Sequence, residues 1–506
     1  MRRISYIINL LIVTAILIGC GESLEDTYDA GNGRIRYLGK CKDLSVTVGW
    51  KRLHLEWKNS VDADIESVKV SWTVKDVKRD SLLPRGTTSC ELLDLADGTY
   101  FLEVCAVDKN GNESFVITNY ARPYTEDHEI VRTFTKAITK FYKVGEHLVF
   151  FMDTWNDNII DITLHYTSSL NGGKKQMTLT KEIFKKGFDI LKNVDTREKI
   201  YIEREGKLEG CPDTLKFEPI ELEDTRIYTS DFKSAIQMRY GFSDKSDVEK
   251  IEFEHFIDTV TMLEFDYDMT TFEDVLYCSK LKKIILGKNR YLVGIYPTTK
   301  DKSILYDEER SIKALNAAID LRGVVIERYN DHYFGNESEL NSLENRGATE
   351  LPDNLSYILP SMIDTITCSI EDQESYLEEL LDNDMATWWE STLQSDVVRT
   401  YELTIVLKEE QPIHGIKIVQ ALYDPTKDRD SKYYIPSSIK IKTSVDERSW
   451  QNVTFMEENT LGQGSGESTL LPIAEGTRSV KFIKVTLVDG VNGSVARVKL
   501  ADIVAY

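Results

Sequence analysis

The stretch LLDNDMATWW, residues 380–389, brings two carboxylates, one hydroxyl and two adjacent indole rings together. Asp382, Asp384 and Thr387 alternate within a turn-forming segment, so a tight backbone can direct their oxygens at one centre. Calcium binds about 6–8 oxygens from carboxylates, hydroxyls and backbone carbonyls. The same carboxylates can instead accept hydrogen bonds from the amides of their own turn. The residues therefore predict either a cation site or a capped turn.

Enzyme signatures are missing from the sequence. It contains no HExxH, Walker loop, Gly-x-Ser-x-Gly elbow or Rossmann fingerprint, and its histidines are scattered. Adjacent carboxylates such as Glu308-Glu309 are common in so acidic a chain and indicate a solvated surface rather than a glycosidase pair. We therefore predict a protein that is not an enzyme, unless residues 127–350 hold an unfamiliar site.

Length and charge limit the architecture and the partners. A chain of 506 residues exceeds the ~250–300 at which single cores stop growing, so several domains are expected. Its 62 basic against 84 acidic residues give a net charge of -22, which repels phosphate backbones. Nucleic acid is therefore not an expected partner.

The first twenty residues predict export. Arg2 and Arg3 precede an apolar run that ends at Ile18, the pattern of a signal peptide. About 15 apolar residues fall short of the ~20 that span a bilayer. The last four, LIGC, resemble the lipobox of bacterial lipoproteins, which implies that residues 1–19 are removed and Cys20 is acylated. The expected contact with the membrane is therefore this lipid anchor alone.

Residues 20–39 predict an acidic, flexible tether. Acidic residues directly after a lipidated cysteine resemble the signal that exports some lipoproteins to the outer face of the outer membrane. We therefore expect an outer membrane lipoprotein at the cell surface. Six cysteines remain without metal-ligand spacing. They can be buried thiols, or Cys90 and Cys105 in neighbouring strands can form a disulfide.

The fold class predicted is mainly β and multi-domain. Alternating runs such as SVKVSWTV indicate a sandwich over residues 40–124, and LADGTYFLEVCAVDKNGNES within it resembles fibronectin type III modules. Trp57 and Trp72 are expected in its core. Residues 127–223 predict a second immunoglobulin-like module, in which KEIFKKGFDILKNV is compatible with a helix.

Residues 224–350 predict a small leucine-rich-like α/β segment. Its Leu/Ile core pattern returns after about 22 residues, inside the ~20–29 residue range of such repeats. SIKALNAAIDLRGVVIE then predicts an amphipathic helix leading into a strand, and residues 336–356 a linker.

Residues 357–506 show alternation again, in motifs with a recognisable order. LLDNDMATWW is followed by TYELTIVLKEEQPIHGIKI, YYIPSSIKIKTSVDERSWQNV and VKFIKVTLVDGVNGSVARVKLADIVAY. Together these resemble the discoidin (coagulation factor five/eight type C) superfamily, which includes the family 32 carbohydrate-binding modules. The resemblance implies a jelly-roll sandwich.

The resemblance also implies a structural calcium ion. Its ligands would be Asp382, Asp384 and Thr387 with the carbonyls of Glu379 and Ala501 and the carboxylate of Asp502. Asp502 stands where the family usually has glutamate, and Asn383 replaces a glycine. Asparagine suits that place because it tolerates a positive φ better than most residues.

Sugar binding is the function that the resemblance implies. Trp389 takes the family's core position, which leaves Trp388 free to face the binding loops. We expect Trp388, Tyr423, Arg429 and Tyr433 to contact a glycan ligand, a polysaccharide or host glycan. The alternative is an adhesion scaffold that binds envelope proteins, because a fold does not determine its ligand.

Overall fold

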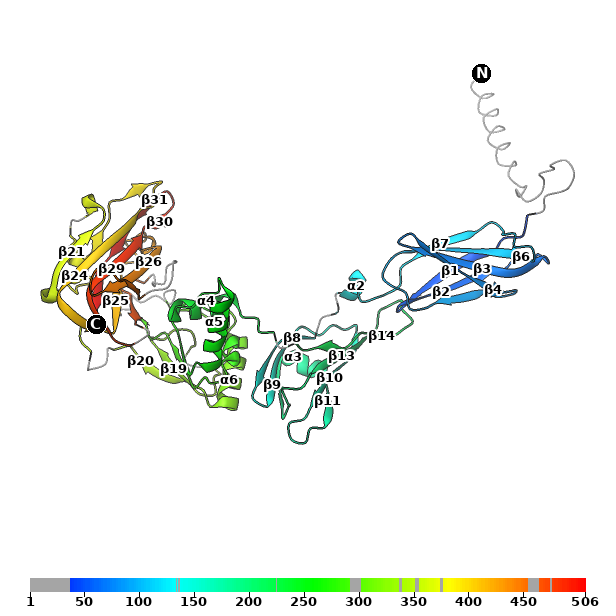
Figure 1. The fold of residues 1–506 in the computed structure, drawn as a ribbon, viewed down its shortest axis with the longest axis horizontal. Coiled ribbons are helices and arrows are strands. Elements are labelled where there is room, and N and C mark those ends of the chain that lie inside the picture. The colour runs from blue at the N-terminus through cyan, green and yellow to red at the C-terminus, as the bar shows by residue number, and fades with distance from the viewer. Residues whose placement is uncertain are drawn as a thin grey trace, which may run out of the picture.

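The protein is described from a computed structural model that covers residues 37–506 apart from 133, 135–136, 224, 292–301, 336–338, 351–354, 374–375, 454–463 and 474–475. The predicted signal peptide, Cys20 and most of the tether lie outside these residues. In the described part, no helix combines the length and hydropathy needed to cross a bilayer. The chain is mainly β and multi-domain, which confirms the predicted fold class, and Figure 1 shows its units following one another in sequence order.

The N-terminal unit is a sandwich of two antiparallel sheets. Alternate side chains of each strand, including Leu53, Leu55 and Val70, point into the core that the sheets share. Trp57 is buried there and Trp72 packs against it. Cys90 and Cys105 form no disulfide. The sheets are β1-β2-β5 (Lys42–Gly49, Arg52–Lys58, Ser89–Leu92) and β4-β3-β6-β7 (Val77–Pro84, Ile65–Val74, Tyr100–Asp108, Ile117–Ala121).

The second unit is also built from two sheets, with short helices at its edges. The helix compatible with KEIFKKGFDILKNV is present as α3 (Lys181–Lys186), which begins after Thr180 and ends at Gly187. The other helix is α2 (Glu129–Arg132). The sheets are β12-β9-β8 (Phe188–Lys192, His147–Met152, Ile138–Val144) and β11-β10-β13-β14 (Lys174–Thr178, Ile159–Thr167, Tyr201–Gly206, Leu215–Lys216), with β15 (Ile220–Glu221) beside β13.

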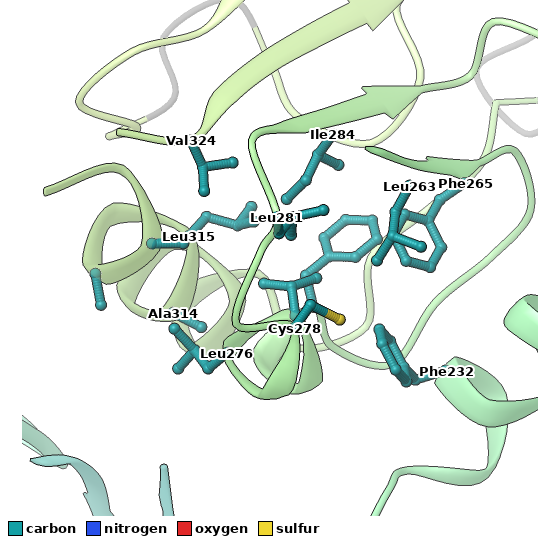
Figure 2. Close-up of a cluster of buried hydrophobic side chains, with 14 of the residues drawn as sticks. Phe232, Leu263, Phe265, Leu276, Cys278, Leu281, Ile284, Ala314, Leu315 and Val324 are labelled. Atoms are coloured by element: carbon teal, nitrogen blue, oxygen red, sulfur yellow. The ribbon is translucent and has the colours of Figure 1, made fainter. Parts of the chain in front are cut away.

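The third unit is an α/β segment around a parallel sheet of order β16-β17-β19-β20 (Met262–Phe265, Lys283–Leu286, Val325–Tyr329, Glu344–Gly347). The helices α4 (Ser230–Tyr240), α5 (Asp247–Thr259) and α6 (Glu308–Arg322) and the 3-10 helix η1 (Glu273–Tyr277) share one hydrophobic core with it. Figure 2 shows Phe232 of α4 and Leu315 of α6 in the cluster with Ile284 of β17. β16 and β17, which lie within the predicted leucine-rich-like segment, pair in parallel. β20, however, lies where the sequence predicted only a linker.

One strand, β9, contributes side chains to the cores of both the second and the third unit. Leu148 and Phe150 of β9 face the second unit's own core, whereas Val149 and Phe151 face the α/β core. A strand buried on both faces explains the continuous apolar run HLVFFM. Beside it, the buried carboxylate of Asp274 accepts hydrogen bonds from Lys140 Nζ at 2.5 Å and Tyr142 Oη at 3.0 Å. The two units therefore pack as one body.

The C-terminal unit is a sandwich whose strands follow the predicted motifs. Its core includes Trp389, Tyr401 and Ile416. Its first sheet has the order β21-β24-β29-β26-β27 (Ile363–Cys368, Thr400–Ile413, Arg478–Val488, Ser438–Ser444, Gln451–Asn452). The second contains β28-β25-β33 (Ser468–Pro472, Gly415–Val419, Asp502–Ala505). Short ladders join β22 (Trp389–Glu390) to β32 (Lys499–Leu500), and β23 (Gln394–Ser395) to β31 (Val495–Arg497) and β30 (Gly490–Asn492).

A strand from the α/β segment completes the second sheet of the C-terminal sandwich. β18 (Arg290–Tyr291) pairs with β28, although the sequence placed these residues in the leucine-rich-like segment. Arg290 forms an ion pair with Glu467, whose side chain is fully buried. An isolated buried carboxylate is costly, so the C-terminal sandwich depends on a residue outside its predicted limits.

We predict that Arg290→Met lowers the free energy of unfolding of the C-terminal unit by about 3–5 kcal/mol, because it leaves Glu467 buried without its cation. The double variant Arg290→Met/Glu467→Gln should recover a large part of that loss, since glutamine carries no charge. Thermal and urea unfolding of the full chain measure both effects. Equal stabilities of the single and double variants would contradict this account of the pair.

Candidate functional site

The turn that carries the two aspartates is held by its own side chains. Asp382 accepts hydrogen bonds from the Asp384 amide at 2.9 Å and the Thr387 hydroxyl at 2.7 Å, and Asp384 accepts one from the Ala386 amide at 2.9 Å. Asn383 has a φ of 59°, the left-handed conformation expected of it. These contacts are those of a capped turn, one of the two interpretations that the sequence left open.

The C-terminal strand brings a third carboxylate to this turn. Asp502 is buried, and it accepts a hydrogen bond from the Asn383 amide at 2.8 Å. Burial raises the pKa of Asp502 to about 6, and the negative charges of Asp382 and Asp384 add to the rise. The charge of the turn therefore suits a cation.

The positions of the side chains support a metal site less strongly than their charge does. Among the described residues, no three His, Cys, Asp or Glu side chains are gathered so that they could hold a metal ion. The Ala501 amide donates to the carbonyl of Val419, and Glu379 lies in the turn η4 (Leu377–Leu381). A bound calcium ion would thus need backbone carbonyls as well as the carboxylates of the turn.

The two tryptophans after the turn point in opposite directions. Trp389 is buried, where its ring meets Tyr401 edge-on at 5.5 Å and its Nε1 donates to the Gln373 carbonyl at 3.1 Å. Successive side chains of an extended chain alternate between faces. Trp388 therefore lies on the other face and stays partly exposed.

That outer face collects charged residues from two distant segments. β22 pairs with β32, so that Glu390 lies opposite Lys499. Alternation places Arg497 on the same side as Lys499, whereas Leu500 faces the core with Trp389. The Nη1 of Arg497 donates to Glu390 at 3.1 Å, and its guanidinium lies 5.6 Å from the ring centre of Tyr434.

A broad, open cleft of about 770 Å³ lies on this face. It is lined by aromatic rings (Trp388, Tyr376), by charged groups (Arg497, Glu379, Glu390), by Gln373 and by other residues of the segment 386–393. Gln373 holds Thr392 in place, because its Oε1 accepts from the Thr392 amide at 2.6 Å and its Nε2 donates to the Thr392 hydroxyl at 2.9 Å. The wall of the cleft is therefore ordered by hydrogen bonds without any ligand.

The lining of this cleft combines aromatic rings with charged and polar groups. An indole ring offers a flat apolar surface, and the fork of Arg497 and Glu390 offers donors and acceptors beside it. Flat apolar surface next to polar groups suits a ligand with an apolar face and several hydroxyls.

The other three predicted sugar contacts do not line the cleft. Tyr423 is partly buried and its amide donates to the Ser465 hydroxyl at 2.7 Å. Arg429 is exposed in the neighbouring loop. Tyr433 is exposed too, with Lys432 Nζ 4.7 Å from its ring centre. Trp388 alone of the four reaches the cleft.

A second hollow, of about 210 Å³, lies between α4, the loop after β16 and β28. Its carboxylates already have partners in the protein: Glu264 binds Arg239, and both oxygens of Asp266 accept from Asn289. The rest of its lining is mostly apolar, including Met238, Phe265 and Leu471. It therefore offers a ligand fewer polar groups than the cleft.

The sequence reasoning missed Tyr376, Glu390, Arg497 and Lys499. For the last two a signal existed, since RVKLA alternates basic and apolar residues and so predicts a strand with Arg497 and Lys499 on its outer face. Nothing in the sequence indicates that this strand pairs with the one after Trp388.

Comparisons with known proteins find a family model and several solved structures that are similar to parts of the chain. A family model described as a domain of unknown function, DUF4998, matches residues 22–205. A search of the curated proteins finds no match.

Solved structures that are similar include a family 32 carbohydrate-binding module from a family 31 glycoside hydrolase of Clostridium perfringens (20% identity, 30% of this chain and 94% of that chain, TM-score 0.23). A family 32 module of NanJ from C. perfringens in complex with galactose has 16% identity over 29% of this chain and 96% of that one, with a TM-score of 0.23. A two-domain fibronectin type III segment of chicken tenascin has 16% identity over 36% and 97%, with a TM-score of 0.19. Likenesses this low carry no argument about a ligand.

We predict opposite outcomes for the two adjacent tryptophans. Trp389→Ala should lower the free energy of unfolding by about 3–5 kcal/mol, because it empties a buried site. Trp388→Ala should cost about 1 kcal/mol or less, since it removes a partly exposed ring and one cation–π contact. Thermal unfolding of the two variants measures the difference. Comparable losses would show that Trp388 is also a core residue.

Proposed function

We propose that the C-terminal sandwich is a discoidin-type module that binds a glycan in the cleft. The observation that carries this proposal is the position of Trp388, which lines the cleft while Trp389 is buried in the core beside it. The ring of Trp388 would stack on the apolar face of a sugar, and Arg497 and Glu390 would bond its hydroxyls.

The proposed role is binding without catalysis. Glycoside hydrolysis requires a pair of carboxyl groups, one of which donates a proton to the leaving group. Glu379 and Glu390 both line the cleft, but Glu390 is already engaged by Arg497.

We also propose that Cys20 anchors the protein by lipid at the surface of the outer membrane. The support is the lipobox-like LIGC and the acidic residues that follow it. Acyl chains on one terminal cysteine would give durable anchoring, because a second chain adds ~0.8 kcal/mol per buried methylene. Cys20→Ala should move the protein from the membrane to the soluble fraction of the cells. Retention in the membrane fraction would refute the lipid anchor.

A second candidate function, protein adhesion, is favoured by the N-terminal sandwich. Tyr120 and Phe115 are 67% and 64% exposed, and the rings of Tyr120 and Phe101 lie 4.9 Å apart. Exposed aromatic rings are typical of protein interfaces. This surface is separate from the cleft, so loss of one activity need not affect the other.

The glycan proposal predicts specific binding on a glycan array. Trp388→Ala should weaken binding about 10- to 30-fold, the effect of removing an aromatic anchor worth about 1.4–2 kcal/mol. Trp450→Ala is the matched control, because Trp450 is also partly buried beneath a lysine, with Lys484 4.7 Å from its ring, but does not line the cleft.

The control variant should bind within about 2-fold of the natural protein. A flat array together with specific capture of a protein would favour adhesion instead. Equal losses in the Trp388 and Trp450 variants would contradict binding in the cleft.

We propose, finally, that calcium binds beside Asp502. The support is the burial of this carboxylate next to Asp382 and Asp384, whose charges a cation would offset. Calcium should raise the melting temperature and EDTA should reverse the rise. Asp502→Asn should melt higher than the natural protein without calcium, because it removes a charge that burial disfavours, and should respond less to the ion. No calcium-dependent shift in the natural protein would contradict the proposal.

A further inference from the structure

Lys499 occupies an unusual place for a lysine. Its side chain is 9% exposed, and its Nζ lies 4.2 Å from the ring centre of Trp388. Burial of an ammonium group is costly unless its charge and its donors are compensated. The groups around Lys499 must therefore compensate its charge and its N–H donors.

The partners of Lys499 come from the loop 423–434. Its Nζ donates to the Ser431 hydroxyl at 2.9 Å and lies 3.6 Å from the carboxylate of Asp428. Its backbone amide donates to the carbonyl of Tyr434 at 2.8 Å. The ring of Trp388 is thus the third neighbour of an ammonium group that has three donors.

The ammonium group of Lys499 lies over the ring of Trp388, which itself lines the cleft. Lys499 does not line the cleft, whereas Trp388 does. An ammonium group that covers the ring face turned away from the cleft would leave the opposite face open to a ligand. A cation packed against one face fixes the rotamer of the ring before any ligand binds. The binding free energy then contains no further entropy cost for immobilising that ring.

We propose that Lys499 is a positioning residue that holds Trp388 so that one face of its ring can stack on a single sugar ring. Asp428 and Ser431 contact Lys499, and they therefore affect glycan binding without touching the glycan. The inference rests on the proposed glycan function and adds a role for the loop 423–434, whose predicted contact residues stand outside the cleft. Through its contacts with Lys499, that loop would fix the position of Trp388 in the cleft wall.

The first test needs no ligand. The fluorescence of Trp388, obtained by subtracting the signal of Trp388→Phe, is quenched with acrylamide in the natural protein, Lys499→Met and Lys499→Arg. Lys499→Met should raise the quenching constant of Trp388 about 2-fold, because both ring faces become accessible. Lys499→Arg should restore it, since a guanidinium also covers an indole face. Lys432→Met is the matched control, because Lys432 covers Tyr433 in the same manner.

The second test uses the best glycan of the array. Lys499→Met should weaken its binding about 3- to 10-fold, and Lys499→Arg should bind within about 3-fold of the natural protein. If Lys499→Met does not fold, Asp428→Asn/Ser431→Ala replaces it, because this variant releases the ammonium group and keeps the lysine. Unchanged quenching in the folded variant overturns the inference. Absence of any glycan that binds the natural protein refutes the proposed function alone, since the quenching result does not depend on it.

Discussion

The burial of Trp389 is the constraint on which the proposed site depends. Its ring fills the core beside Tyr401, and its Nε1 donates to the Gln373 carbonyl. Because neighbouring side chains of an extended strand face opposite ways, this anchor forces Trp388 outward. A core residue and the proposed ligand platform are thus adjacent in the chain, so the burial of Trp389 determines the direction in which Trp388 points.

Pairings between distant segments supply the rest of the site and its support. The ladder of β22 and β32 brings Arg497 and Lys499 to Trp388, and β18 brings Arg290 to Glu467 from outside the sandwich. Toward the N-terminus, Arg52 holds Asp213 with two hydrogen bonds, at 2.7 and 2.8 Å, between the first two units. Each unit is therefore joined to the next by buried or partly buried contacts.

The sequence predicted what depends on local pattern. Alternation located the strands of both terminal sandwiches, and the helix of SIKALNAAIDLRGVVIE is α6 followed by β19. The resemblance to discoidin domains placed Trp389 in the core, and the positive φ of Asn383 followed from its residue type.

What the sequence could not predict depends on pairing across long distances. The two residues of β18 are too short a run to show which sheet they join, and β20 is an exposed strand without an alternating apolar pattern. The sequence predicts Tyr423, Arg429 and Tyr433 as sugar contacts because they lie in loops, but a loop's position in the sequence does not show which side of the sandwich end it covers. Tyr376 is recognised only from the geometry of the cleft, and Arg497, although its strand is predicted, only from the pairing of β22 with β32.

The central claim is that the cleft beside Trp388 is the binding site, and a crystal structure of the protein with the best glycan of an array tests it most directly. The account predicts one sugar ring stacked on the face of Trp388 opposite Lys499, with a hydroxyl within hydrogen-bond distance of Arg497. A glycan bound against Tyr423, Arg429 or Tyr433, with no contact to Trp388, would contradict it.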